Sequence, residues 1–406
     1  MEPSTTTTTT TTPFIELRSD TFTQPTAALR TAMLQADCGD DVWGEDETVK
    51  VLERRAALLT GKPAALWVPT GTMGNLSSLL SHCSRRGEEV IVGKQSHIYQ
   101  YEAGGASVLG GIPFNAVDEE ERGTLPLASL RAAVRRPFGE KQQGYGRGDN
   151  EEELESGDPH SAPTRLICLE TTHNRCGGAV LPLSYLREVR ALAHEFGGLK
   201  IHLDGARLFN AAVSLKVPVS EITQHVDSVT FCLSKGLGAP AGSVLCGEVA
   251  FIARARRFRK MLGGGLRQVG VLAAPGLVAL GDEQIGRLSI DHANARRFAE
   301  GVRGIRGLVV DGGGSGGGDE GGDAPETNIV VFGFSRQLLA QLGAKKSKQL
   351  SHEDVVAGLK ARGVKIAGFR DRLRAVTCYE VSEGEVERAV EALREVVGEL
   401  LLAAGV

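Results

Sequence analysis

The chain has 406 residues, of which 41% are hydrophobic and 24% are charged, and its formal net charge is −4. This length is enough for one large domain and a smaller one, and the composition is typical of soluble globular proteins. The charge offers no general attraction to nucleic acid or anionic membranes, and no apolar run approaches the roughly twenty residues that cross a bilayer. We therefore expect neither nucleic acid nor a membrane as a partner.

The cysteines and the N-terminus both bear on the cellular compartment. Seven cysteines are scattered along the chain, mostly within apolar segments. An odd, scattered set predicts reduced, buried thiols rather than a disulfide framework. The threonine run at 5–12 lacks the basic and apolar regions of a targeting peptide. We expect a disordered tail over residues 1–14 and a cytoplasmic protein, with a mitochondrial address left open.

Beyond this tail, helical and strand patterns alternate. In chain order they predict helices over 25–36 and 47–59, a strand over 64–68, a helix from 69 to about 83, a strand over 89–92, a helix over 124–136, a strand over 165–169, a helix over 184–196, and strands over 199–203 and 228–233. Such alternation favours a three-layer α/β fold, with a mostly parallel sheet covered by helices.

The composition changes after residue 281. A basic helix over 292–303 is followed by strands over 328–332 and 374–379 and by helices over 353–361 and 383–401. We therefore expect a large domain over 15–281 and a smaller α+β domain over 282–406. Two polar, glycine-rich insertions, 139–162 and 311–326, bury too little apolar surface to offset their chain entropy, so we expect mobile surface loops there.

Two charged residues follow successive strands of the predicted sheet. Lys235 lies between the apolar strand 229–233 and a glycine-rich turn, where desolvation favours a neutral amine that can attack a carbonyl. About thirty residues earlier, another strand ends at Asp204, with Arg207 just beyond it. Pyridoxal phosphate needs a lysine for its aldehyde and an acid for its ring nitrogen. The pair therefore predicts a pyridoxal-phosphate site, whereas either residue alone would be weak support.

A glycine-containing segment, Pro69–Asn75, lies where a strand becomes a helix. Its glycines let backbone N–H groups approach an anion, and the helix dipole favours negative charge there. The lysine of a Walker loop is missing, so the segment does not predict binding of a nucleoside triphosphate. A plain helix start is the alternative interpretation.

Two histidines, His97 and His173, follow other strand ends. His97 could stack on a cofactor ring or act as a base, and a capping or surface role is the alternative. The spacing of Cys168, His173 and Cys176 is not that of a zinc site, so no metal is expected. Ligands of open α/β sheets gather at the carboxyl ends of strands. We therefore expect both histidines to share one crevice with Gly71, Thr72, Asp204 and Lys235.

Seven segments together resemble the low-specificity L-threonine aldolases, which are pyridoxal-phosphate enzymes with the aspartate-aminotransferase fold (fold type I). They occur in family order and cover residues 15–280 densely, and the C-terminal part more loosely. The matching segments are Leu17–Thr21, Gly39–Asp46, Pro69–Asn75, Glu170–Asn174, His202–Leu208, Ser234–Pro240 and Arg259–Gln268.

The resemblance implies a carbon–carbon lyase that cleaves L-threonine or L-allo-threonine to glycine and acetaldehyde, through a Lys235 aldimine and a quinonoid. It implies that Asp204 pairs with the pyridine nitrogen, that His97 stacks on the ring and that His173 lies near the substrate hydroxyl. The remaining implied roles are phosphate binding by Gly71 and Thr72, substrate-carboxylate binding by Ser19, Arg207 and Arg374, a further cofactor contact of Arg207, and contacts of Lys260 and Arg267 from a neighbouring subunit.

Some features depart from the family pattern or leave alternatives open. The segment Arg374–Glu380 carries Cys378 where the family usually has histidine, and Trp43 and Thr171 replace a common tyrosine and asparagine. The resemblance also implies a homotetramer, a dimer of dimers with shared active sites. The alternatives are another lyase of the same fold, of the β-eliminating or serine-hydroxymethyl type, or an inactive homologue with a binding role.

Overall fold

The computed structural model describes residues 14–136, 158–311, 324–344 and 350–405. The predicted tail and most of the two predicted insertions fall outside the described residues. Within these ranges, every helix is either too short or too polar to cross a bilayer. The cytoplasmic location stays a prediction.

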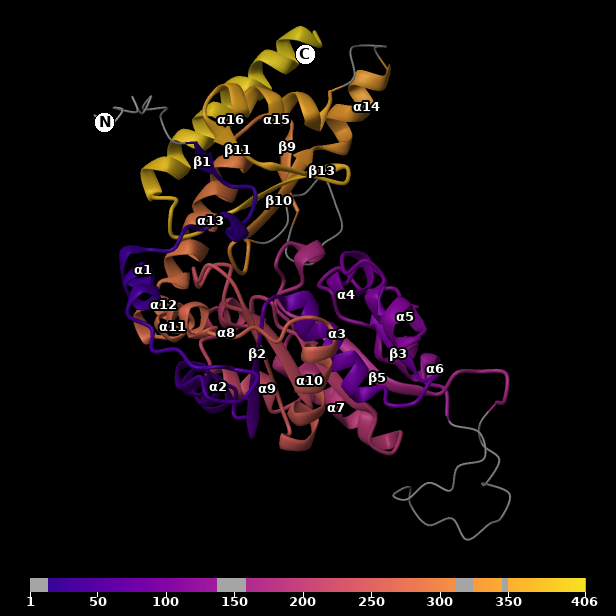
Figure 1. Cartoon of the computed structure of the whole chain (residues 1–406). Helices are drawn as coiled ribbons and strands as arrows, with labels where there is room; N and C mark the ends of the chain where they lie inside the picture. Colours follow the sequence, from indigo (N-terminus) through magenta and orange to yellow (C-terminus); the bar gives the residue numbers. More distant parts are fainter. Residues whose placement is uncertain (1–13, 137–157, 312–323, 345–349, 406) are drawn as a thin grey trace, which may run out of the picture.

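A mostly parallel sheet forms the centre of the larger part of the molecule (Figure 1). Among the described residues it has seven strands in the order β2-β8-β7-β6-β5-β3-β4. Only β8 runs antiparallel to its neighbours in this described sheet. The strands are β2 Ala64–Val68, β3 Glu89–Gly93, β4 Phe114–Val117, β5 Thr164–Glu170, β6 Lys200–Asp204, β7 Ser228–Cys232 and β8 Ser243–Gly247. The predicted α/β class is confirmed, whereas β4 and β8 were not predicted.

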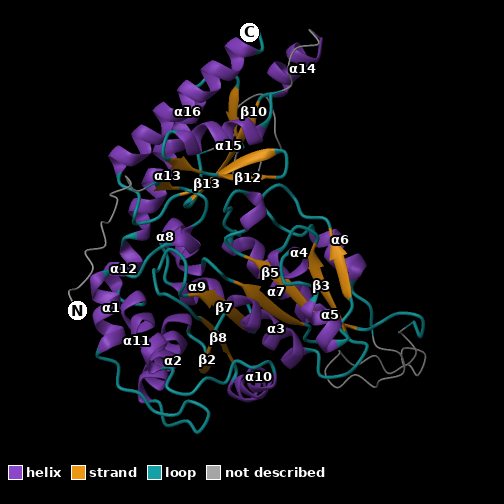
Figure 2. Cartoon of the chain, turned by 45° about the horizontal axis from the view of Figure 1, so that its top comes forward, coloured by secondary structure: helices purple, strands orange, loops and turns teal. Residues whose placement is uncertain are grey.

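Helices cover both faces of this sheet, which gives three layers (Figure 2). In β5, Leu166 and Cys168 join a core that includes side chains of α3, whereas Ile167 and Leu169 join the larger core on the opposite face. The helices of this part are α1 Ala27–Leu34, α2 Glu47–Thr60, α3 Gly71–His82, α4 His97–Gln100, α5 Gly105–Gly110, α6 Leu127–Ala133, α7 Leu183–Glu195, α8 Leu208–Leu215, α9 Val219–Thr223, α10 Val249–Met261, α11 Gly270–Ala279 and α12 Asp282–Gly286. Strands buried on both faces appear in the sequence as continuous apolar runs, which made them recognisable.

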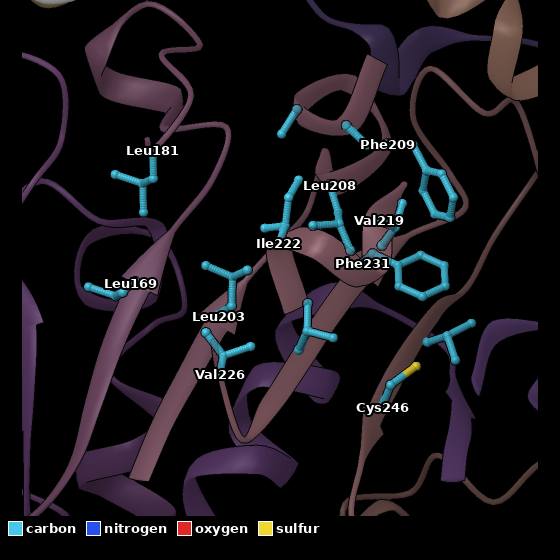
Figure 3. Close-up of a cluster of buried hydrophobic side chains, with 14 of the residues drawn as sticks. Leu169, Leu181, Leu203, Leu208, Phe209, Val219, Ile222, Val226, Phe231 and Cys246 are labelled. Carbon is cyan, nitrogen blue, oxygen red and sulfur yellow. The ribbon is translucent and has the colours of Figure 1, made fainter. Parts of the chain in front are cut away.

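The larger core holds the strand ends in place (Figure 3). Phe231 of β7 is fully buried, and its ring meets that of Phe209 edge to face, with centroids 5.2 Å apart. Leu203 of β6 packs in the same core. Burial of side chains of this size contributes about 1.5–3 kcal/mol each. The core therefore fixes the positions from which Asp204 and Lys235 leave the sheet.

A second core belongs to the smaller part of the molecule. There β12-β13-β10-β9 form an antiparallel sheet, and β1 pairs in parallel with β11. The elements are β1 Ile15–Glu16, α13 Leu288–Arg303, β9 Leu308–Val310, β10 Ile329–Phe334, α14 Arg336–Ala344, α15 His352–Ala361, β11 Val364–Lys365, β12 Ala367–Phe369, β13 Arg372–Val376 and α16 Glu383–Ala403.

The start of the described chain lies in this second core, although the predicted boundary assigned residue 15 onward to the large domain. Ile15 and Leu17 are buried among side chains of the C-terminal part, and Figure 1 shows β1 next to β11. A two-residue strand gives too short a pattern for its partner to be recognised from sequence. The rest of the domain division stays a prediction.

Candidate active site

The carboxyl ends of β2, β3, β5, β6 and β7 lie at the same edge of the sheet, because these strands are mutually parallel. A cavity of about 170 Å³ opens there. It is lined by Pro69, Thr70, Gly71, Thr72, Asn75, His97, Glu102, Asp204, Ala206, Cys232, Ser234 and Lys235. Of the predicted site residues, the fold thus brings Gly71, Thr72, His97, Asp204 and Lys235 to one place.

Two hydrogen bonds to its carbonyl oxygen hold the backbone of Lys235 in place. Its carbonyl oxygen accepts hydrogen bonds from the N–H of Gly238 at 2.8 Å and from the hydroxyl of Thr23 at 3.1 Å. Gly238 has a φ of 83°, which favours glycine in this turn. The lysine side chain is half-buried and lines the cavity. The amine is therefore presented from a fixed backbone to an enclosed space.

Asp204 is buried at the end of β6, the strand next to β7. Its Oδ1 accepts a hydrogen bond from the N–H of Ala206 at 3.1 Å, and its Oδ2 accepts one from the amide of Asn75 at 2.9 Å. Hydrogen bonds from two donors stabilise a carboxylate. The arrangement offers a fixed negative charge on the cavity wall.

His97 begins the short helix α4 beside the same cavity. Its backbone N–H donates to Glu170 at 2.6 Å, and its Nδ1 lies 3.1 Å from Oε1 of Glu102. Burial would lower the pKa of this imidazole, but the bond to Glu102 and the charge of Asp204 outweigh burial and raise it. Because Glu102 engages Nδ1, Nε2 is the ring atom left to exchange a proton.

The start of α3 forms another wall of the cavity. The hydroxyl of Thr70 caps the helix by accepting from the N–H of Met73 at 3.1 Å. A Cβ at Gly71 would lie 3.0 Å from the sulfur of Cys232, so a side chain there would crowd β7. The N–H groups of the first helical turn have no partner within the helix and suit an anion.

A buried ion pair lies behind Lys235. The guanidinium of Arg207 donates to both carboxylate oxygens of Asp20, at 2.8 and 2.7 Å, and Asn328 adds a third hydrogen bond to Asp20 at 3.1 Å. Burial alone would raise the pKa of Asp20, but Arg207, with a contribution from Lys235, lowers it to about 2. The fork of Arg207 is thus directed at a residue of this chain.

Arg374, on β13, lies near enough to this ion pair for the charges of Arg207 and Asp20 to affect its pKa. Its guanidinium donates to Asn174 at 2.9 Å and to the carbonyl of Arg18 at 3.1 Å. Its Nε has no hydrogen-bond partner among the described residues. Burial, reinforced by the charge of Arg207, lowers its pKa to about 10. Arg374 therefore keeps one donor, without a partner among the described residues, that suits an incoming anion.

Six predicted residues do not line the cavity, namely Arg207, Arg374 and four others. His173 is 1% exposed, and its Nε2 lies 3.6 Å from Oε1 of Glu119. Burial would lower the pKa of His173, but Glu170, Cys176 and Glu119 raise it well above its ordinary value. The other three are Ser19, which caps the 3₁₀ helix Asp20–Phe22, and the exposed Lys260 and Arg267.

Comparison with known proteins identifies the family. Residues 16–144 and 149–312 match the beta-eliminating lyase family. The low-specificity L-threonine aldolase of Escherichia coli (strain K12) is 48% identical over 289 residues, which are 71% of this chain and 79% of the relative. Low-specificity L-threonine aldolase 1 of Arabidopsis thaliana is 40% identical over 382 residues, which are 94% of this chain and 96% of the relative.

The chain belongs to the low-specificity L-threonine aldolases. The predicted family and the predicted enzyme class, a carbon–carbon lyase, are therefore confirmed. Among solved structures, a threonine aldolase of Leishmania major matches with a TM-score of 0.71 and 18% identity, covering 94% of this chain and 99% of that chain. A serine palmitoyltransferase of Sphingomonas wittichii matches with a TM-score of 0.65 and 17% identity, over 97% and 88% of the two chains. These structures show the fold alone, because one fold hosts several reactions.

Three polar residues of the aldolase site were missed in the sequence. Asn75 belongs to a segment that was interpreted only as an anion-binding helix start, and Asp20 lies in a segment noted only for the family resemblance. Glu102 follows His97 by five residues across a helix end, a spacing without a regular pattern. Glu102 has apolar and glycine neighbours, which was the available signal, whereas Asp20 lies between two polar residues and only the fold shows what it contacts.

Proposed function

We propose that this aldolase cleaves L-threonine and L-allo-threonine to glycine and acetaldehyde, with pyridoxal phosphate held by Lys235 and Asp204. The observation that carries the proposal is that these two side chains leave adjacent strands, β7 and β6, and line the same cavity. An amine and a carboxylate so placed can bind the aldehyde and the ring nitrogen of one cofactor. The family relationship supports the same cofactor.

The residues present fit this cofactor at three points. Lys235 supplies the amine, Asp204 the counter-charge for a protonated ring nitrogen, and the glycine-bearing start of α3 the N–H groups for a phosphate. When bound, pyridoxal phosphate supplies an electron sink for the pair left on Cα when the Cα–Cβ bond breaks. The protein's own task is to hold the substrate and to move the hydroxyl proton.

Arg374 and His97 are proposed for these two tasks. The open Nε of Arg374 suits the substrate carboxylate better than the guanidinium of Arg207, whose fork is occupied by Asp20. Fixing the carboxylate also sets which bond at Cα is aligned for cleavage. His97 lines the cavity and has Nε2 free, so it is placed to take the β-hydroxyl proton.

His173 and Ser19 have supporting roles in this proposal. His173 is buried beside Glu119 and away from the cavity lining, so it acts on the substrate hydroxyl only through His97 or an intervening water. Ser19 precedes Asp20, and its hydroxyl caps the 3₁₀ helix that carries this acid. His173 thus supports the proposed base, and Ser19 supports the acid that holds Arg207.

The reaction products distinguish aldol cleavage from its alternatives. We expect the purified protein, supplied with pyridoxal phosphate, to release acetaldehyde and glycine in equal amounts from L-threonine and from L-allo-threonine. Acetaldehyde can be coupled to an alcohol dehydrogenase and glycine measured by chromatography. Formation of 2-oxobutanoate and ammonia would instead indicate β-elimination, and the absence of any product would indicate an inactive homologue.

We also propose that the active sites are shared between subunits of a homotetramer. Lys260 and Arg267 are exposed and remote from the cavity lining of their own chain, so a role at a site requires a neighbouring copy. Exposed apolar side chains accompany these cations. Those side chains are Val42, Trp43, Met261 and Leu266, with exposed fractions of 37%, 78%, 65% and 37%. Exposed apolar clusters mark protein–protein contacts.

Mixing two inactive variants tests this sharing. Lys235→Ala removes the cofactor lysine of one chain, and Lys260→Ala removes the residue proposed to be donated to the partner. A mixed dimer contains one intact site, so co-refolded variants should recover roughly a quarter of wild-type activity at equal proportions. Each variant alone should stay far below this value. The proposal would be contradicted if a verified mixed oligomer recovered no activity. A fully active monomer in sedimentation would also contradict it.

A further inference from the structure

In the wall of the cavity, the amide of Asn75 joins two buried carboxylates. Its nitrogen lies 2.8 Å from Oε1 of Glu102 and 2.9 Å from Oδ2 of Asp204, and all three residues are at most 8% exposed. An oxygen of Glu102 and one of Asp204 lie within 4.8 Å of each other. Two like charges this close and this buried disfavour each other's ionised form. An NH₂ group that gives one hydrogen to each acid offsets this repulsion without adding charge.

The orientation of this amide is fixed by its other atom. Oδ1 of Asn75 lies 3.1 Å from Nε2 of His202, which is fully buried. A carbonyl oxygen can only accept, so Nε2 carries the hydrogen and Nδ1 is bare. Burial lowers the pKa of His202 to about 4, so the ring is neutral at physiological pH. A flipped amide would turn Oδ1 toward both carboxylates and break all three hydrogen bonds.

The bare Nδ1 of His202 is also satisfied. The hydroxyls of Ser78 and Ser228 each lie 2.9 Å from it, and the hydroxyl of Ser228 lies 2.7 Å from Nε2 of His82. One hydroxyl can donate to each ring, so the tautomer required by Asn75 has its donor. The result is a continuous chain of polar groups from the interface of α3 and the sheet to Asp204. Apolar side chains could fill this space without any hydrogen bonds, whereas these polar groups require each donor to meet an acceptor.

We propose that Asn75, locked by His202, is a positioning residue that holds the carboxylate of Asp204 aimed into the cavity and separates it from the carboxyl group of Glu102. This inference rests on the proposed function, because Asp204 serves as the counter-charge of the cofactor nitrogen. Glu102 in turn holds Nδ1 of His97, so the same amide also supports the proposed base. One uncharged side chain thereby lies between the two acids of the site and fixes the position of each.

The test compares the binding of pyridoxal phosphate to apoprotein variants across pH. In Asn75→Leu, Asp204 loses this donor, and Glu102 loses the hydrogen bond from Asn75 that lowers its pKa, so Glu102 stays protonated to higher pH. We expect the dissociation constant of the cofactor to rise about tenfold, and the acid limb of cofactor binding to move up by about one pH unit. Visible absorbance of the bound cofactor reports both quantities. A purely structural role would lower the melting temperature and leave the acid limb unchanged.

Two controls make the outcome decisive. Ser81→Ala removes another buried polar side chain of α3, whose one hydrogen bond among the described residues goes to the carbonyl of Ser77, and should leave both quantities as in wild type. His202→Gln keeps a donor for Oδ1 of Asn75 and should stay near wild type, whereas His202→Leu should shift the acid limb as Asn75→Leu does. This second pair decides the matter if Asn75→Leu does not fold.

The failure of this inference differs from the failure of the proposed function. A wild-type protein that binds no pyridoxal phosphate would overturn the function itself. The positioning role alone would be overturned by a different result. In that case the wild type binds the cofactor, and a folded Asn75→Leu or His202→Leu variant binds it equally well, with an unshifted acid limb.

Discussion

Lys235→Ala should abolish L-threonine cleavage, with a loss of more than about 10³-fold in kcat, because no other lysine of the described residues lines the cavity. Lys235 lines the cavity from a backbone that Gly238 and Thr23 hold in place. Borohydride reduction of the wild type should fix the cofactor to a single peptide, the one that contains Lys235. Acetaldehyde release and peptide mapping measure the two effects independently.

Lys94 provides a matched control for this experiment. It too follows a strand of the same sheet, β3, but it is exposed, pairs with Asp118 at 2.8 Å and does not line the cavity. Lys94→Ala should therefore keep nearly full activity. Labelling of any lysine other than Lys235, or activity that survives Lys235→Ala, would remove the basis of the proposed function.

Asp204→Asn should be the second most damaging change, with a fall of about 10³-fold in kcat and little effect on folding. The substituted side chain has the same shape, but it cannot offer a negative charge to a protonated ring nitrogen. The hydrogen bond from Ala206 can be kept, whereas the new NH₂ group would face the NH₂ group of Asn75, so the change removes the charge and one hydrogen bond. Steady-state kinetics and the visible spectrum of the bound cofactor measure the effect.

A cofactor analogue separates charge from structure in this variant. Pyridoxal phosphate methylated at its ring nitrogen carries a permanent positive charge and does not need an acid to stay protonated. It should recover a substantial part of the activity of Asp204→Asn, and the recovery should be absent in Lys235→Ala. If the analogue gives no recovery in a variant with an unchanged melting temperature, the proposed role of Asp204 is wrong.

The sequence by itself was sufficient to identify the functional residues that lie at strand ends. An apolar run followed by a charged residue and a glycine turn occurs in one short segment, so Lys235 and Asp204 could be recognised locally. Strands buried on both faces gave the same advantage for β5, β6 and β7, because their burial makes them continuously apolar. By contrast, β8 was missed although it is apolar. Its residues do not indicate that it runs antiparallel between two strands of an otherwise parallel sheet.

The tertiary structure alone decided which polar groups meet. Asp20 and Arg207 pair across 187 residues of sequence, and Asn75 reaches Asp204 across 129. Such contacts depend on how loops from different strands converge, and no local pattern encodes that convergence. For this reason the sequence treated His97 and His173 alike, while the fold places one at the cavity and buries the other beside Glu119. The residues next to strand ends indicate which cofactor the site binds. The role of each residue in the site depends on distances that only the folded chain determines.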